Sequence, residues 1–379
     1  MKKAFLFILV FAVCANFAQA ENVQKRGMFV SVIEDPLVLS SREEISKLVS
    51  FAKKTNVDTL FVQIYRSGKA WFPSENADAG PYENLKTQLG EDPLALLIRE
   101  AHAAGIEVHA WLNMLTLNEN AEAPLLKKYG ADILTQKPRP EKKTLEDYKI
   151  DNQYFLEPAD WRVREELSLL VEEVVRAYPE LDGLQLDYIR YPDSNPFYGY
   201  SPESIGRFKQ TTGETDVTEG NVRWKDWRRR QVTELVEILK RRAQIIRPTL
   251  QFSTTGCAPY TRAMEECFQD WPAWARHGLA DFVTVMTYPP DAETFERYLK
   301  GLKQRLLDFS NINIGIGVYK LTAQPEVFAK QLELCQSSGA RGCVVFYYGI
   351  LRDYPEMARV FSPKGESDFG EEKRSDNEF

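Results

Sequence analysis

The sequence predicts a single α/β domain, a (β/α)8 TIM barrel that extends over residues 21–361. Segments typical of buried strands alternate with segments typical of amphipathic helices along the whole chain, and eight such strand–helix units follow one another. The strand segments are short and apolar with little alternation, as expected of parallel strands that are buried on both faces. Together these two observations favour a closed parallel barrel.

The elements are expected in the following order. The strands are predicted at 27–32, 59–65, 107–112, 183–187, 251–255, 282–286, 313–317 and 342–346. The helices are predicted at 42–55, 93–104, 162–177, 225–246, 271–277, 292–309, 324–338 and 354–361. The first helix follows Ser40 and Ser41, either of which can cap its free amide groups. A doubly wound open sheet is the alternative, but residues 32–36 lack the glycine-rich phosphate loop that such a sheet carries after its first strand.

The first 20 residues resemble a signal peptide. Lys2 and Lys3 are followed by an apolar run at 4–15 that is too short to span a bilayer, and residues 18–20 read Ala-Gln-Ala, a small-residue cleavage site. We therefore expect the mature chain to begin at Glu21 and to be exported, either to a periplasm or to the medium. No later stretch is long and apolar enough to be a transmembrane segment.

The charge of the chain excludes some classes of partner. The formal net charge is −7, which argues against nucleic acid and anionic membranes. The basic clusters at 228–230 and 240–242 fit the solvated face of an amphipathic helix. Residues 362–379 are acidic and nearly free of apolar side chains, so we expect a disordered tail. The sequence leaves the oligomeric state open.

Beyond the leader there are four cysteines, in two locally close pairs. Cys257 lies near Cys267, and Cys335 lies near Cys343. In an oxidising compartment each pair can close a short loop, and four buried free thiols are the alternative. We expect the Cα atoms of Cys335 and Cys343 to be within about 7 Å if they bond. Because no CxxC motif or Cys/His cluster is present, we expect no metal and no cofactor.

The segment at 182–192 carries the strongest functional signal. It reads as a buried strand that ends in Asp187, and Arg190 follows three residues later. Parallel barrels keep their chemistry at the carboxyl ends of their strands. The competing interpretation is an Asp–Arg pair that braces the loop after the strand.

Polar and aromatic residues also follow the other predicted strands. Aromatic faces stack on the C–H faces of sugars, and amide, guanidinium and carboxylate groups bond their hydroxyls. The expected substrate-binding residues are Gln63, Tyr65, Arg66, Trp71, Trp111, Asn113, Tyr288, Asp291, Tyr319 and Tyr347.

Other kinds of catalysis find little support in the sequence. The chain has three histidines, and only His109 is on a predicted strand, where a packed barrel residue is the simpler interpretation. Metal-dependent hydrolase barrels need several ligands at their strand ends. No GxSxG nucleophile motif is present. Carboxylates remain, and pairs of carboxylates catalyse glycoside hydrolysis.

The chain resembles the glycosyl-hydrolase-like family 10 group of bacterial cell-envelope proteins, which are (β/α)8 barrels. The matching segments are 26–30, 58–63, 107–113, 182–192, 227–229, 269–271 with Trp274, and 281–288. One departure is Gln185, which stands where the family often has His. The resemblance implies action on glycans, with some members linked to peptidoglycan, although not every member is implied to be an active hydrolase.

By analogy with other sugar-cleaving barrels, Asp187 is the expected nucleophile or transition-state stabiliser, and Arg190 or Arg66 is expected to keep it ionised. The glutamate that many such barrels have near strand five is missing, because residues 253–256 read Ser-Thr-Thr-Gly. Glu157 is the first choice for the acid. Asp291 and Glu34 remain alternatives. An exported glycoside hydrolase is the expected function, and a non-catalytic glycan-binding barrel is the alternative.

Overall fold

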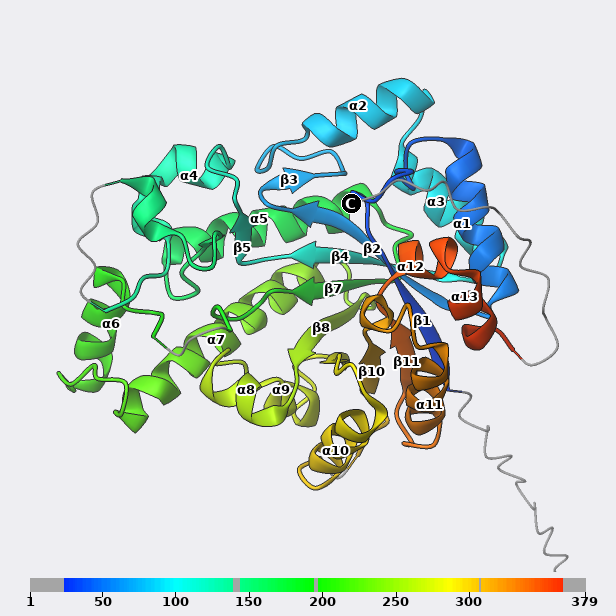
Figure 1. Cartoon of the computed structure of the whole chain (residues 1–379). Coiled ribbons are helices and arrows are strands. Elements are labelled where there is room, and N and C mark those ends of the chain that lie inside the picture. Colours follow the sequence, from blue (N-terminus) through cyan, green and yellow to red (C-terminus); the bar gives the residue numbers. More distant parts are fainter. Residues whose placement is uncertain (1–23, 139–143, 194–196, 307, 364–379) are drawn as a thin grey trace, which may run out of the picture.

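Eight parallel strands close into a barrel in the computed structural model, which describes residues 24–138, 144–193, 197–306 and 308–363 (Figure 1). The strands are β1 (Lys25–Val30), β2 (Thr59–Arg66), β4 (Glu107–Asn113), β7 (Gly183–Asp187), β8 (Gln251–Cys257), β9 (Phe282–Thr287), β10 (Ile312–Ile316) and β11 (Gly342–Val345). Each pairs with the next in this order, and β11 pairs with β1. This closure confirms the predicted barrel and excludes the open sheet.

Eight helices follow the strands and cover the outside of the barrel. They are α1 (Arg42–Lys54), α3 (Pro93–Ala103), α5 (Trp161–Ala177), α7 (Val222–Ile246), α9 (Trp271–Arg276), α10 (Ala292–Lys303), α11 (Pro325–Gln336) and α13 (Pro355–Phe361). Several begin at a side-chain cap. Ser41, for example, accepts a 3.1 Å hydrogen bond from the Glu44 amide, which satisfies a backbone group that has no partner within the helix.

The strands bury different residues on their two faces. The outward side chains, such as Leu60, Val108 and Leu184, pack under the helices in one large apolar core. A smaller core fills the barrel and contains Phe29, Phe61, Trp111, Phe282 and Val344. Burial on both faces explains why the strand segments show so little alternation in the sequence.

His109 belongs to the barrel interior. Its ring lies 5.3 Å from the Phe61 ring and 5.7 Å from the Phe282 ring, and the side chain is fully buried. Burial lowers the pKa of this imidazole to about 3. The structure therefore supports the packed barrel histidine that the sequence predicts.

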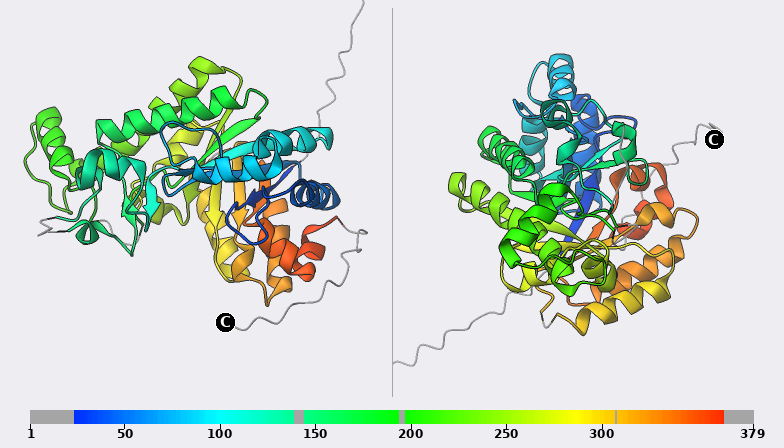
Figure 2. Two further views of the ribbon diagram at one scale, coloured as in Figure 1. Left: turned by 90° about the horizontal axis from the view of Figure 1, so that it is seen from above. Right: turned by 90° about the vertical axis from the view of Figure 1, so that its left-hand side faces the viewer.

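A lobe extends beyond the carboxyl ends of β4 and β7, at the left of Figure 1 and in the left view of Figure 2. It is built from the segments before α5 and before α7. Its elements are β5 (Thr116–Asn118), α4 (Pro124–Tyr129), η1 (Gly130–Ile133), η2 (Leu145–Tyr148), β6 (Tyr154–Phe155) and α6 (Pro202–Thr212). A third apolar cluster holds α6 on α7 and includes Phe208, Trp224 and Trp227.

The predicted strands and helices are all present, with ends that shift by a few residues. The largest shift is in the helix predicted at 292–309, which ends at Lys303. Besides the lobe, the prediction missed β3 (Lys69–Ala70), α2 (Gly80–Leu89), α8 (Tyr260–Glu265), η3 (Val318–Lys320) and α12 (Tyr348–Asp353). These elements are short. The proline and glycine residues that occur at helix ends are also typical of loops, so the sequence pattern does not distinguish a short helix from a loop.

The two cysteine pairs differ in the structure. Cys335 on α11 and Cys343 on β11 form a disulfide with their Cα atoms 6.1 Å apart, within the predicted limit. Cys257 and Cys267 are buried free thiols. No helix of the described part of the chain is long and apolar enough to cross a membrane. The predicted leader at 1–20, and the predicted tail apart from Ser362 and Pro363, lie outside the described residues.

Candidate functional site at the carboxyl end of the barrel

Asp187 is the last residue of β7, and it lies level with Asn113 on the neighbouring strand β4. Its side chain is 5% exposed. Directly after it, Tyr188 adopts φ +51, a left-handed conformation that is uncommon for residues other than glycine. Residues held in such conformations are enriched at functional sites. The chain therefore turns sharply where the candidate carboxylate is presented.

Three donors from three segments hold the Asp187 carboxylate. The indole Nε1 of Trp111 donates to Oδ2 at 3.0 Å, and the Thr255 hydroxyl donates to Oδ1 at 2.6 Å. The Tyr188 amide also donates to Oδ1, at 2.7 Å. An ionised carboxylate only accepts hydrogen bonds, so a set made entirely of donors suits the charged form. The group is thus oriented for a role that needs negative charge.

Arg190 does not form the predicted ion pair with Asp187. Its guanidinium lies 3.4 Å from a carboxylate oxygen of Asp193 and 4.8 Å from the centre of the Tyr188 ring. Its Nη1 donates to the Tyr191 carbonyl at 3.1 Å. Within the described residues, no Lys, Arg or His nitrogen lies within 4.0 Å of the Asp187 carboxylate. The direct contacts to this carboxylate therefore come from neutral donors.

Aromatic rings gather beside Asp187 at the ends of β4, β9, β10 and β11. Tyr288 stacks on Phe346 with ring centres 5.7 Å apart, and Tyr319 meets both rings edge to face. Phe346 also contacts Trp111 and Tyr347, at 5.9 and 5.2 Å. Burial, followed by the charge of Asp187, raises the pKa of the Tyr288 hydroxyl well above its ordinary value. Tyr288 therefore stays a protonated donor near the carboxylate.

Two buried side-chain amides lie at the same end of the barrel. Gln63 donates from Nε2 to the Asn113 side-chain oxygen at 3.4 Å, and it accepts from the Ser31 hydroxyl at 3.5 Å. Both amides are almost fully buried. Trp111, Asn113, Tyr288 and Tyr347, all predicted from strand ends, are thus found around this end of the barrel.

Tyr65 and Trp71 are placed differently. Tyr65 is 1% exposed and Trp71 is 8% exposed, and both belong to the core between strands and helices. Arg66, at the end of β2, is partly exposed. Burial raises the pKa of the nearby Tyr188 hydroxyl, and the charge of Arg66 is among the smaller effects that oppose this. The register of β2 shifts between Gln63 and Tyr65, which changes the face to which the following residues point.

Glu157 lies in the segment between β6 and α5. It is fully buried, and its Oε1 accepts a 2.6 Å hydrogen bond from the Tyr191 hydroxyl and a 3.3 Å bond from the Ala159 amide. Burial raises the pKa of this carboxyl group, against the opposing effect of its hydrogen bonds. Its role as the general acid stays a prediction.

The other two candidate acids occupy different environments. Asp291 is the exposed N-cap of α10, where it accepts a 2.7 Å bond from the Thr294 amide, and this bond lowers its pKa. Glu34 is partly buried in the loop after β1, beside Tyr347. Burial, followed by the Glu34 charge, raises the pKa of the Tyr347 hydroxyl to about 12.

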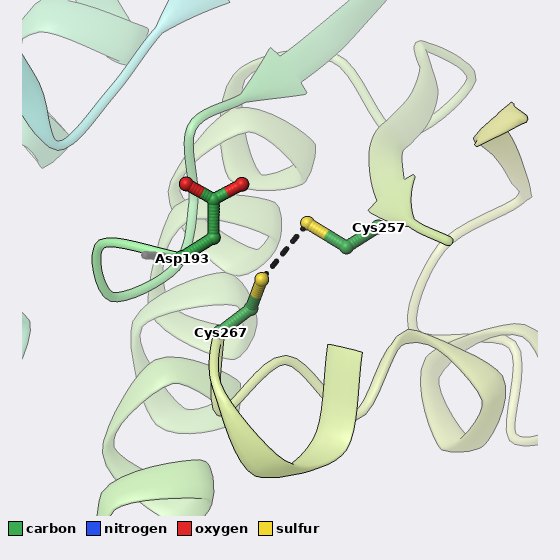
Figure 3. A group of neighbouring side chains, drawn as sticks. All are labelled: Asp193, Cys257 and Cys267. Atoms are coloured by element: carbon green, nitrogen blue, oxygen red, sulfur yellow. Dashed lines mark hydrogen bonds between the residues drawn. The ribbon is translucent and has the colours of Figure 1, made fainter. Parts of the chain in front are cut away.

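Two residues of this site were left out of the predicted set. Thr255 and Phe346 each end a predicted strand, but neither belongs to the predicted set of site residues. Alternation along β11 gives the signal for Phe346, because Val344 points into the barrel and Phe346 is two residues further on. One group of three possible metal ligands occurs among the described residues, Asp193 with Cys257 and Cys267 (Figure 3).

A protein family and several known proteins match most of this chain. The family model for glycosyl hydrolase-like 10 proteins matches residues 24–330. Glycosyl hydrolase DigH of Escherichia coli K12 is 26% identical over 273 residues, which cover 65% of this chain and 58% of that protein. Glycosyl hydrolase YngK of Bacillus subtilis is 24% identical over 274 residues, 66% of this chain and 50% of that protein. The matches thus span 58% and 50% of the length of these two relatives.

Solved structures share the fold. A family 42 β-galactosidase from G. stearothermophilus superposes with a TM-score of 0.60 at 11% identity, covering 90% of this chain and 57% of the other. The catalytic domain of a β-amylase from Paenibacillus polymyxa gives 0.55 at 12% identity, covering 90% and 95%. At such identities the likeness concerns the barrel alone. The match of the family model over most of the chain shows that this protein belongs to the glycosyl hydrolase-like 10 family.

Proposed function

We propose that this protein is an exported glycoside hydrolase that cleaves an envelope or extracellular polysaccharide, with the glycan strands of peptidoglycan as the first substrate to test. One observation carries the proposal. A carboxylate held by three donors lies at the carboxyl end of the barrel, beside a cluster of aromatic rings. The family membership supports the same class of reaction.

The proposed chemistry begins with a sugar ring that lies against the aromatic cluster of Tyr288, Tyr319 and Phe346. Asp187 then acts on the anomeric carbon, either as a nucleophile or by stabilising the positive charge that develops there. Its three donors fix the direction of the carboxylate before the substrate arrives. Tyr288, kept protonated, is placed to donate a hydrogen bond to a sugar oxygen or to Asp187.

Protonation of the leaving group needs a second carboxylic acid. Among the three candidates we favour Glu34, because it is partly exposed and lies next to Tyr347 of the aromatic cluster. Glu157 is fully enclosed, and Asp291 is already engaged as a helix cap. Turnover of Glu34→Gln, Glu157→Gln and Asp291→Asn would be compared on one substrate. Loss confined to Glu157→Gln would contradict the choice of Glu34.

The decisive experiment measures new reducing ends on a panel of glycans that includes peptidoglycan strands stripped of their peptides. Asp187→Asn keeps the shape of the side chain but removes its charge. We expect it to lower turnover by about a thousandfold or more, with the melting temperature and the glycan affinity nearly unchanged. If Asp187 only braces the loop, the same change lowers stability and leaves turnover intact.

A glycan-binding barrel without hydrolysis is the second candidate, and the burial of Glu157 is the observation that favours it. The same panel separates the two functions. Saturable glycan binding by the unmodified protein, with no new reducing ends on any substrate, would establish binding alone and overturn the hydrolase proposal.

The proposed export rests on the leader pattern at 1–20, and the disulfide between Cys335 and Cys343 supports it. Intact-mass measurement of protein recovered from the periplasm or medium of a bacterial host tests it. We expect a mature chain that begins at Glu21. Recovery of the uncleaved chain in the cytosol would contradict this.

A further inference from the structure

Cys257 and Cys267 lie side by side next to the segment that follows Asp187. Cys257 ends β8, and Cys267 follows α8 ten residues later. Their sulfur atoms are 3.1 Å apart, and both side chains are buried (Figure 3). The catalytic scheme proposed above uses neither residue.

Hydrogen bonds connect the segment that carries the two cysteines to the segment at 188–193. The Cys267 carbonyl accepts a 3.0 Å bond from the Tyr191 amide. The Gln269 side chain bonds the Cys257 amide at 2.9 Å, and its Nε2 donates to the Ile189 carbonyl at 3.4 Å. The segment from Cys257 to Gln269 therefore holds the turn that leaves β7 directly after Asp187.

Ion pairs also connect these two segments. Arg262, on α8 between the cysteines, forms an ion pair with Asp193, and Arg190 lies 3.4 Å from the other oxygen of that carboxylate. Burial raises the pKa of the Cys267 thiol, but the hydrogen bond with Cys257 and the charges of Arg190 and Arg262 outweigh it and lower that pKa overall. Cys267 is thus the thiol that more readily becomes a thiolate, the reactive form in disulfide exchange.

We propose that Cys257 and Cys267 form a second disulfide in the exported chain, which fixes the loop after β7 and thereby the position of Asp187. The oxidant is an external disulfide, such as that of a thiol–disulfide oxidoreductase. The Cys267 thiolate attacks one of its sulfurs, and Cys257 then displaces the mixed disulfide. Two electrons pass to the external disulfide, which leaves as two thiols and takes up the two protons that the cysteines lose.

A metal ion fits this place less well. Two sulfurs on a tetrahedral zinc ion, each bonded at about 2.3 Å, would lie roughly 3.8 Å apart, further than the sulfurs do here. The third possible ligand, Asp193, is already paired with two guanidinium groups. A bound cation would compete with both arginines for one carboxylate, whereas a disulfide needs no charge compensation.

Peptide mapping of the exported full chain tests the bond, and its result does not depend on hydrolase activity. Free thiols are first blocked under denaturing conditions, and the protein is then digested with trypsin without reduction. Arg262 is the only tryptic site between Cys257 and Cys267, and Arg341 is the only one between Cys335 and Cys343. A disulfide therefore appears as two linked peptides, and the pair at 335 and 343 is an internal control. We expect both linked species.

Two results would overturn the bond. One is a pair of separately blocked peptides for Cys257 and Cys267 while the control pair is linked. The other is retention of one zinc ion per chain that is lost in Cys257→Ala/Cys267→Ala.

The coupling to the β7 turn is tested by hydrogen exchange and thermal unfolding. In Cys257→Ala/Cys267→Ala we expect faster exchange of the Tyr191 amide and a melting temperature about 5 °C lower. Cys335→Ala/Cys343→Ala is the matched control and should leave exchange at Tyr191 unchanged. Equal protection of Tyr191 in the native protein and in Cys257→Ala/Cys267→Ala would show that the bond does not hold this turn.

Discussion

Asp187 shows how one side chain gains its role from distant parts of the chain. Trp111 and Thr255 are 76 and 68 residues away from it, on two other strands. Both donate hydrogen bonds to the carboxylate. These bonds would be weakened or lost, at a cost in free energy, if the carboxylate lost its charge or moved. The candidate site therefore depends on neutral donors that are already in place.

Trp111→Phe tests this arrangement. The variant removes the indole N–H but keeps an aromatic ring against Phe29 and Phe346. A hydrogen bond to a charged group is worth about 1.5–3 kcal/mol, so we expect turnover to fall roughly 10- to 100-fold. The control is Trp274→Phe, which removes a 2.9 Å bond to Thr233. An equal loss of turnover in both variants would contradict a specific role for Trp111.

His109 is expected to make the protein sensitive to acid. Its pKa is lowered by burial from 6.5 to about 3, so the unfolded chain takes up a proton between these values that the folded barrel does not. The contribution of His109 to the free energy of unfolding is fully present above pH 6.5. It falls by about 1.4 kcal/mol per pH unit as the pH drops towards 3. Denaturant unfolding of His109→Leu between pH 7 and 4 should show a shallower decline. The exposed His277→Gln is the control and should match the unmodified protein.

At the scale of single elements, glycine marks where β7 enters the barrel. A Cβ atom on Gly183 would lie 2.3 Å from Nδ1 of His109 and 2.8 Å from the Gln251 carbonyl oxygen. Only glycine, which has no side chain, fits at this position of the strand. In contrast, Gly206 on α6 has open space around its Cβ position.

The two glycines give a matched pair of substitutions. Gly183→Ala is expected to lower the free energy of unfolding by about 1–3 kcal/mol, because the imidazole is enclosed and can move little. Gly206→Ala should raise it by up to about 1 kcal/mol, since alanine favours helix more than glycine does. Urea denaturation measures both changes. A neutral Gly183→Ala would show that the barrel interior adapts more than the packing implies.

At the scale of the whole molecule, the last helix packs against the first strand. Arg26 on β1 lies 4.4 Å from the centre of the Phe361 ring on α13 and donates to the Phe361 carbonyl. Phe361 also stacks on Phe328 of α11. The described contacts at this end reach Ser362, which bonds back to Ala358.

Two truncations test where the folded unit ends. Removal of residues 364–379 is expected to leave the melting temperature unchanged, because the contacts of α13 are kept. Removal of residues 355–379 deletes α13 and exposes Arg26 and Phe328, so we expect a fall of many degrees or loss of soluble protein. Calorimetry of both proteins decides this. Equal melting temperatures would contradict a role for α13 in closing the barrel.

Local patterns in the sequence were sufficient for the barrel. Strands buried on both faces and amphipathic helices each follow from the spacing of apolar residues over a few turns or a few strand positions. The same patterns place Asp187 at one strand end, Trp111 and Asn113 at a second, and Tyr288 at a third. These predictions needed only the rule that parallel strands end at one side of a barrel.

Only the tertiary structure decided which groups meet. Arg190, three residues from Asp187, faces Asp193, whereas the partners of Asp187 include Trp111 and Thr255 from distant strands. Glu157 is buried and accepts a hydrogen bond from the hydroxyl of Tyr191, 34 residues away. Such contacts depend on barrel closure and on side-chain direction after a turn or bulge, and neither is encoded in local apolar spacing. The sequence by itself therefore determined the fold and the position of the candidate carboxylate, and the closed barrel determined its hydrogen-bonding environment.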